Sequence, residues 1–181
     1  MSLKEKYISE IRVKLQDSFH YKSAARAPRF TKVVVNVGFG KLLKESKIQE
    51  TIGSTLERIT GQKPVFTKAR KSISNFKVRE GQVIGAKVTL RGSRMYDFLD
   101  KLINITFPRT RDFRGLSEKS FDRRGNFAIG FKEHVAFPEV RSDEVERLHG
   151  LEVAVTTDAK TTEEAKMLFR FAGFPLQKIT K

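Results

Sequence analysis

The strand pattern at residues 82–90, QVIGAKVTL, limits the folds open to this chain more than any other feature of its sequence. Successive side chains of a strand point to opposite sides of a sheet. Here aliphatic residues take one side, whereas Lys87, Thr89 and the following Arg91 take the other. Other elements can therefore cover such a sheet on one face only, because the second face is charged.

The segment RFTKVVVNVGFG at residues 29–40 shows the same alternation, with Lys32 and Asn36 opposite three valines. Both strands thus offer a side with cations, short polar groups and small residues. Cations suit the phosphates of RNA, and short polar groups suit its 2′-hydroxyls. The pattern predicts a face that binds RNA, and a merely solvated outer face is the alternative that it leaves open.

Helical and strand patterns alternate along the chain, which indicates an α+β fold. We predict a mostly antiparallel sheet with helices packed on one face, in a single domain of residues 1–181. Helical patterns occur at residues 1–19, 45–61, 93–107 and 161–174. Strand patterns occur at residues 29–40, 63–67, 82–92 and 151–158, and residues 118–132 resemble a hairpin that turns near Gly125.

Several residues are typical of helix ends. Gly61 suits the left-handed position after the second helix. Ser93 is predicted to cap the third helix, which should stop before Pro108. Thr161 and Glu164 have the spacing of a capping box at the start of the last helix.

The charge of the chain is large and uneven. Thirty-six Lys and Arg face 21 Asp and Glu, which gives a formal net charge of +15. Residues 61–92 hold eight bases against one acid, whereas the acidic part at residues 133–181 holds nine acids against seven bases. An excess of this size favours a polyanionic partner, and nucleic acid is the first candidate.

The sequence offers little for catalysis. It has no cysteine, and His20, His134 and His149 occur at unrelated positions, so no metal site and no cofactor are expected. GFGK at residues 38–41 lacks the spacing of a phosphate-binding loop. No apolar run approaches the roughly 18 residues of a membrane span, and the first 19 residues lack the apolar core of a signal peptide. We expect a cytoplasmic protein that is no enzyme and contacts no membrane.

A cationic segment follows the short third strand pattern. We call residues 68–81 the basic loop; few of its side chains are apolar, and five are bases. Such a loop suits contact with phosphates, with an aromatic ring able to stack on a base. A flexible solvated loop with its ring tucked against the protein is the alternative. The candidate contact residues are Lys68, Arg70, Lys71, Ser72, Asn75, Phe76, Lys77 and Arg79.

Motifs over almost the whole length, in the same order, resemble the family of bacterial large-subunit ribosomal protein number five, which binds 5S rRNA. They are LERITGQKPVFTKARKS at residues 56–72, NVGFG at 36–40, FRGL at 113–116, FDRRGNFAIGFKEHVAFPE at 121–139 and EEAKMLFRFAGFP at 163–175. The hairpin tip departs from the family pattern, because Arg123 and Arg124 make it more basic than expected.

The resemblance implies a structural protein of the large ribosomal subunit, bound to 5S rRNA through the open face of its sheet. Four positions match the family's RNA-contacting residues, namely Lys32, Asn36, Gln62 and Thr89. Lys63, Lys87 and Arg91 complete the predicted rRNA-binding set. The basic loop would reach the peptidyl-site tRNA, and other loops would contact a protein of the small-subunit head.

The acidic part is a natural partner for a basic protein. We therefore predict that the contact with the small-subunit head involves Asp143 and Glu144 with three nearby bases, Arg109, Arg111 and Arg114. The expected partners are 5S rRNA, peptidyl-site tRNA, large-subunit rRNA and proteins, and that head protein. A free-standing RNA-binding or RNA-modifying factor that uses the same basic face is the alternative function.

Overall fold

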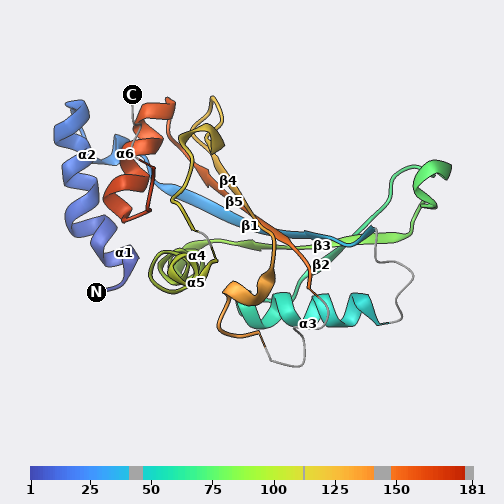
Figure 1. The fold of residues 1–181 in the computed structure, drawn as a ribbon. Coiled ribbons are helices and arrows are strands. Elements are labelled where there is room, and N and C mark those ends of the chain that lie inside the picture. Colours follow the sequence, from blue (N-terminus) through green and yellow to red (C-terminus); the bar gives the residue numbers. More distant parts are fainter. Residues whose placement is uncertain (41–46, 112, 141–147, 178–181) are drawn as a thin grey trace. The chain divides into compact units, whose positions relative to one another are not determined.

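The computed structural model describes residues 1–40, 47–111, 113–140 and 148–177 (Figure 1). The strands are β1 (Phe30–Gly38), β2 (Val65–Lys68), β3 (Val83–Leu90), β4 (Phe127–Phe131) and β5 (Leu151–Thr157). The α-helices are α1 (Leu3–Lys6), α2 (Arg12–Phe19), α3 (Ile48–Thr60), α4 (Gly92–Lys101), α5 (Phe107–Arg109) and α6 (Thr162–Ala172). A π-helical turn joins α1 to α2, and another joins α4 to α5.

The five strands form an antiparallel sheet in the order β2-β3-β1-β5-β4. β2 and β4 are therefore the edge strands. Strands and helices alternate along the chain, and the predicted α+β class is confirmed.

The contacts of the chain divide it into two compact units. Unit 1 consists of Met1–Val33, Leu90–Ile129 and Ala154–Lys181, and unit 2 of Val34–Thr89 and Gly130–Val153. β1, β3, β4 and β5 contribute residues to both units. Folding as one domain stays a prediction.

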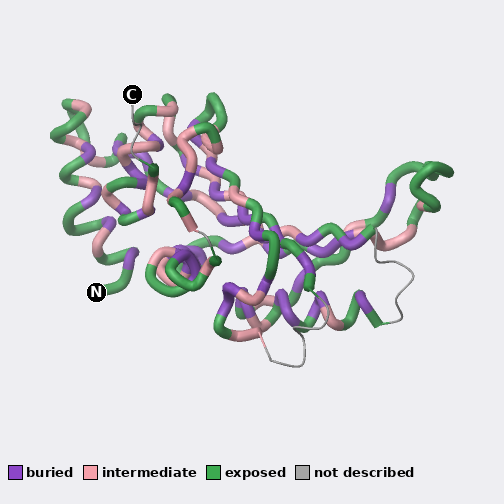
Figure 2. Tube along the Cα trace, viewed as in Figure 1, coloured by how far each residue is buried: buried purple, intermediate pink, exposed green. Residues whose placement is uncertain are grey.

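Aromatic rings form much of the core of unit 1. The ring of Phe169 lies 5.2 Å from that of Phe30, 5.0 Å from that of Phe121 and 4.6 Å from that of Phe174, measured between centroids. Tilted and edge-to-face pairs at these separations add to the free energy gained from burial. Phe169 comes from α6 and is fully buried, so these contacts fix that helix within the unit. Figure 2 shows in purple the buried residues along the chain.

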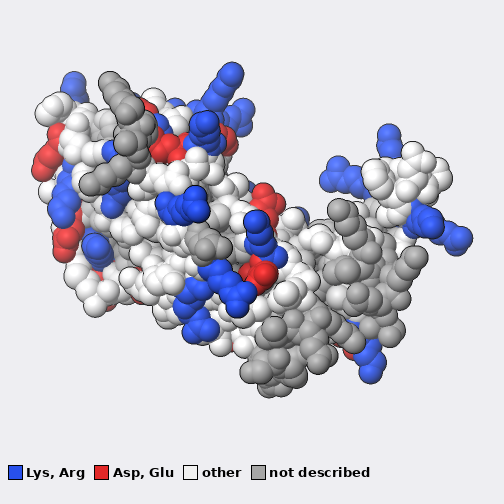
Figure 3. Space-filling model, in the orientation of Figure 1, with Lys and Arg blue, Asp and Glu red and all other residues white. Residues whose placement is uncertain are grey.

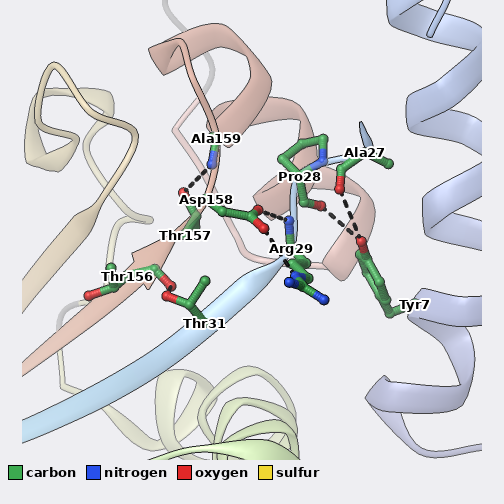
Figure 4. Close-up of polar contacts among 9 residues, drawn as sticks. All are labelled: Tyr7, Ala27, Pro28, Arg29, Thr31, Thr156, Thr157, Asp158 and Ala159. Atoms are coloured by element: carbon green, nitrogen blue, oxygen red, sulfur yellow. Dashed lines mark hydrogen bonds and ion pairs between the residues drawn. The ribbon is translucent and has the colours of Figure 1, made fainter. Parts of the chain in front are cut away.

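Polar contacts join the start of β1 to the end of β5 in unit 1 (Figure 4). One carboxylate oxygen of Asp158 accepts a hydrogen bond from the backbone N–H of Arg29 at 2.6 Å, and the other accepts one from Arg29 Nε at 3.0 Å. The hydroxyl of Tyr7 donates to the carbonyl of Pro28 at 3.1 Å. Burial raises the pKa of Tyr7 to about 12, so the hydroxyl keeps its proton and stays a donor in alkaline as well as neutral solution.

In unit 2, α3 places its apolar stripe in the core. Ile48, Ile52, Leu56 and Ile59 are all buried, as their spacing predicts. Figure 1 shows α3 running along the strands of this unit, and a side chain at Gly53 would lie only 3.1 Å from the ring of Phe66 in β2. α3 therefore covers one face of β2.

Two of the predicted helix ends are correct. Gly61 follows α3 with φ of 67°, a left-handed conformation that glycine adopts without steric cost, and its N–H donates to the carbonyl of Glu57. Thr161 caps α6, since its hydroxyl accepts from the N–H of Glu164. The carboxylate of Glu164 in turn accepts from the N–H of Lys160, the residue before the cap.

The predicted ends of the third helix are wrong. α4 begins at Gly92, so Ser93 lies inside the helix, and Arg91 occupies the capping position without a side-chain cap. Helical structure also continues through Pro108 to Arg109. Pro108 follows the π-helical residues and lies one residue before the end of this helical segment, so only the last turn must accommodate its ring and its missing N–H.

Candidate nucleic-acid interface

The alternation predicted for the strands is present in unit 2. Val35 and Val37 of β1, and Ala86 and Val88 of β3, are buried. Their neighbours on the other side are more accessible: Asn36 and Thr89 are half-buried and Lys87 is exposed. We call the accessible side of these strands the open face.

The pairing of β2 with β3 adds two residues to the open face. Val65 lies opposite Lys87 and Thr67 opposite Gly85, so the side chains of Val65, Thr67 and Lys87 point to the same side. Val65 is 63% exposed. Sequence reasoning missed Val65 and Thr67, because a four-residue strand does not reveal which residues of β3 it pairs with.

Glycine at position 85 is required where three strands come close together. A Cβ atom there would lie 2.8 Å from Thr67 Oγ1 and 3.0 Å from the carbonyl oxygen of Val37. Any side chain would push β1 or β2 away. Gly85 therefore keeps the polar groups of the open face close to one another.

Gln62 is held next to the open face by hydrogen bonds. Its side-chain Nε2 donates to the carbonyl oxygen of Thr89 at 3.2 Å, which joins the segment after α3 to the end of β3. Its backbone N–H donates to the hydroxyl of Thr60, which itself donates to the carbonyl of Leu56 at 2.6 Å. The structure thus brings two predicted RNA-contacting residues together, and the predicted Lys63 is exposed beside them.

The basic loop is an irregular hairpin with backbone hydrogen bonds at two levels. At its base, the N–H of Ala69 donates to the carbonyl of Gln82 at 2.8 Å. Further out, Ile73 and Val78 form an antiparallel bridge. A single 3-10 turn, Ser74–Phe76, and a left-handed Lys77 close the tip. The loop therefore has a defined shape, although it packs few side chains.

The tip of the basic loop is accessible, including its apolar residues. Phe76 is 72% exposed and Ile73 is 46% exposed, so the ring is not tucked against the protein. All five bases of the loop are exposed, and none forms an ion pair within the described part of the chain. Figure 3 shows Lys and Arg side chains projecting around the loop, at the right of the view.

Some predicted site residues belong to unit 1. Lys32 is half-buried on β1, and Arg91 is exposed before α4. The bases predicted to contact the small-subunit head, Arg109, Arg111 and Arg114, are exposed. Asp143 and Glu144 lie outside the described residues.

Two of the three histidines come together, although the sequence places them at unrelated positions. His20 is exposed at the end of α2, whereas His134 and His149 stack in unit 2 with ring centroids 3.9 Å apart. Among the described residues, no group of three or more His, Cys, Asp or Glu could hold a metal ion. No helix in the described ranges is long and apolar enough to cross a membrane.

Comparison with known families covers most of the chain. The profile described as "Ribosomal protein L5" matches residues 23–79, and the profile described as the C-terminus of the same ribosomal family matches residues 83–176. The chain belongs to the ribosomal protein L5 family. Members of this family are structural proteins of the large ribosomal subunit, so the predictions of a ribosomal location in the cytoplasm and of no enzymatic activity are confirmed.

Individual members of the L5 family are similar along nearly their whole length. "Large ribosomal subunit protein uL5" of Halothermothrix orenii is 52% identical over 176 residues, which are 97% of this chain and 98% of the relative. The protein of the same name from Brevibacillus brevis is 51% identical over 176 residues, with the same shares. That from Natranaerobius thermophilus is 51% identical over 173 residues, 96% of this chain and 97% of the relative.

Proposed function

We propose that this structural constituent of the large ribosomal subunit binds 5S rRNA through the open face of its sheet. Membership of the L5 family supports this ribosomal role over the alternative of a free-standing RNA-binding or RNA-modifying factor. The finer assignment, to 5S rRNA and to particular residues, depends on the chemistry of the face itself.

The observation that carries this proposal is the polar arrangement around Gln62 and Thr89. The bond from Gln62 to the Thr89 carbonyl leaves the Thr89 hydroxyl available to a ligand. The side-chain amide of Asn36 makes no hydrogen bond with any described residue. Free polar groups of this kind suit ribose hydroxyls, and the exposed Lys87 suits phosphate.

Replacing Asn36 or Thr89 with alanine tests the proposal. We expect each variant to weaken 5S rRNA binding by about 1–2 kcal/mol, the value of a hydrogen bond to a fixed or charged group. The Gln62 bond survives in Thr89→Ala, because the backbone carbonyl accepts it. Thr51→Ala in α3 is the matched control, since its hydroxyl already donates to the carbonyl of Lys47. Unchanged affinity in both test variants, measured by filter binding, would remove the open face from the proposal.

The basic loop is proposed to contact the peptidyl-site tRNA. Its exposed bases and the exposed ring of Phe76 support this assignment, because cations bind phosphates and aromatic rings stack on unpaired bases. The contact with a small-subunit head protein stays a prediction. Two of its five candidate residues lie outside the described ranges.

A further inference from the structure

A second cationic feature, which the open face and the basic loop do not include, is the turn before β4 in unit 1. We call residues 122–126 the arginine turn. The carboxylate of Asp122 accepts from the N–H of Arg124 at 2.8 Å, from the N–H of Asn126 at 2.7 Å and from Asn126 Nδ2 at 2.8 Å. These three bonds fix the turn from within.

The arginine turn is also anchored to neighbouring elements. The hydroxyl of Thr157 in β5 donates to the carbonyl of Gly125 at 2.9 Å, and the N–H of Thr157 donates to Asn126 Oδ1 at 3.2 Å. Gly125 has φ of 74°, and a Cβ there would lie 2.9 Å from Ala165 and 3.0 Å from Ala159. Position 125 therefore accepts only glycine, and the turn is held against the start of α6.

Arg123 and Arg124 are exposed on this rigid support. Neither forms an ion pair with any residue in the described ranges. Asp122 forms no ion pair with either arginine among the described residues, although its negative charge attracts Arg124. Burial alone would raise the pKa of Asp122, but the hydrogen bonds from Asn126 and Arg124 lower it below its usual value.

The surroundings of the turn carry charges of both signs, but the carboxylates of Asp158 and Glu163 are already paired with Arg29 and Lys166. Lys160 is exposed and directly follows Ala159, which touches the turn. Figure 3 shows Lys and Arg side chains projecting over this region, at the top of the view. Two unpaired guanidiniums on a fixed backbone suit bidentate contact with phosphate oxygens, and little side-chain entropy is lost per bond formed.

We propose that Arg123 and Arg124 form a phosphate-binding site for an RNA backbone, additional to the open face. The site contacts either 5S rRNA or large-subunit rRNA, since both present the same sugar-phosphate chemistry. It does not depend on the proposed binding of 5S rRNA by the open face.

The test is the double variant Arg123→Ala, Arg124→Ala, compared with Lys4→Ala, Lys14→Ala. Both variants lose two positive charges from exposed positions in unit 1. Alanine at position 124 keeps the backbone N–H that bonds to Asp122, so the turn should persist. Arg123→Gln, Arg124→Gln serves as a second variant if the alanine protein unfolds at a lower temperature than the control.

Affinity is measured separately for 5S rRNA and for protein-free large-subunit rRNA, over a series of salt concentrations. We expect the arginine variant to bind one of these RNAs about tenfold or more weakly than the lysine control does. The slope of log affinity against log salt should become shallower by about 1–2, since about one counterion is released per phosphate contact. The RNA that loses affinity identifies the source of the phosphates.

The proposal would be overturned if the arginine variant had the same affinities and salt slopes as the control for both RNAs. An acidic protein would then be the remaining candidate partner for the turn. The variants Asn36→Ala and Thr89→Ala, measured in parallel, separate the two proposals. Weak binding by the arginine variant alone supports the turn and not the open face. Weak binding by the open-face variants alone supports the open face and contradicts the proposed site at the turn.

Discussion

The basic loop of unit 2 and the cluster around Glu118 in unit 1 use positive charge in opposite ways. In the Glu118 cluster, the carboxylate accepts from Lys166 Nζ at 3.0 Å and from Arg170 Nη2 at 2.8 Å. Lys166 also pairs with Glu163 at 3.0 Å. The side chains of Glu118 and Lys166 are only 11% and 17% exposed. In the basic loop, by contrast, five exposed bases have no carboxylate partner within the described ranges.

This difference separates cations that stabilise the fold from cations that are available to a ligand. Arg170 and Lys166 belong to α6, and Glu118 precedes β4, so their ion pairs join segments about 50 residues apart. The hydrogen bonds of the basic loop are mostly local and involve its backbone. Removing charge should therefore cost stability in the cluster and RNA affinity in the loop.

The largest expected effect is on the loop. Replacing Lys68, Arg70, Lys71, Lys77 and Arg79 with glutamine should weaken the retention of peptidyl-site tRNA on reconstituted ribosomes by about 100-fold at low salt. The free energy of unfolding should change by no more than about 0.5 kcal/mol, because exposed unpaired charges contribute little to stability. Undiminished tRNA retention would identify the loop as merely solvated.

A shortened loop is the matched control for shape. Ile73 and Val78 already face each other, so Asn-Gly in place of residues 74–77 would close the hairpin with a two-residue turn. This variant keeps four of the five bases but loses Phe76. Compared with Lys77→Gln alone, it separates the contribution of the tip and its ring from that of the charge.

The next effect is on the Glu118 cluster. Glu118→Ala should lower the free energy of unfolding by about 1–2 kcal/mol, because it leaves Arg170 and Lys166 without the carboxylate that binds both. Glu10→Ala is the control, since Glu10 pairs with Lys14 in an exposed helix and should cost only tenths of a kcal/mol. Urea unfolding followed by circular dichroism measures both. If Glu118→Ala and Glu10→Ala lost the same free energy of unfolding, partial burial of the Glu118 cluster would add no stability.

The smallest expected effect is a dependence of stability on pH. Hydrogen bonding from Lys166 holds the pKa of Glu118 below its ordinary value. The ionised carboxylate therefore stabilises the fold above its ordinary pKa, and this contribution is lost as the pH falls through the lower value of the folded protein. Unfolding free energies from about pH 7 down to about pH 3 should fall less steeply in Glu118→Gln than in the unaltered protein. If the unfolding free energies of the two proteins fell equally steeply with pH, Glu118 would not be the source of this pH dependence.

The sequence by itself determined the features that depend on near neighbours in the chain. Strand alternation predicted which side of β1 and β3 is buried, because the period of two is a property of the backbone. The glycine after α3 predicted where that helix ends, because only a local conformation is involved. The excess of bases at residues 61–92 likewise predicted an exposed cationic segment.

The tertiary structure decided which distant residues meet. The register of β2 against β3 added Val65 and Thr67 to the open face, and the bond from Gln62 to the Thr89 carbonyl spans 27 residues. Folding also distinguished Arg170, which binds Glu118, from Arg123, which binds no described residue. Both arginines are exposed, Arg170 in a helix and Arg123 in a turn. They differ in whether a carboxylate from elsewhere in the chain lies within reach. The free energy of a charge depends on what lies within a few ångströms of it, and that is fixed by packing rather than by order along the chain.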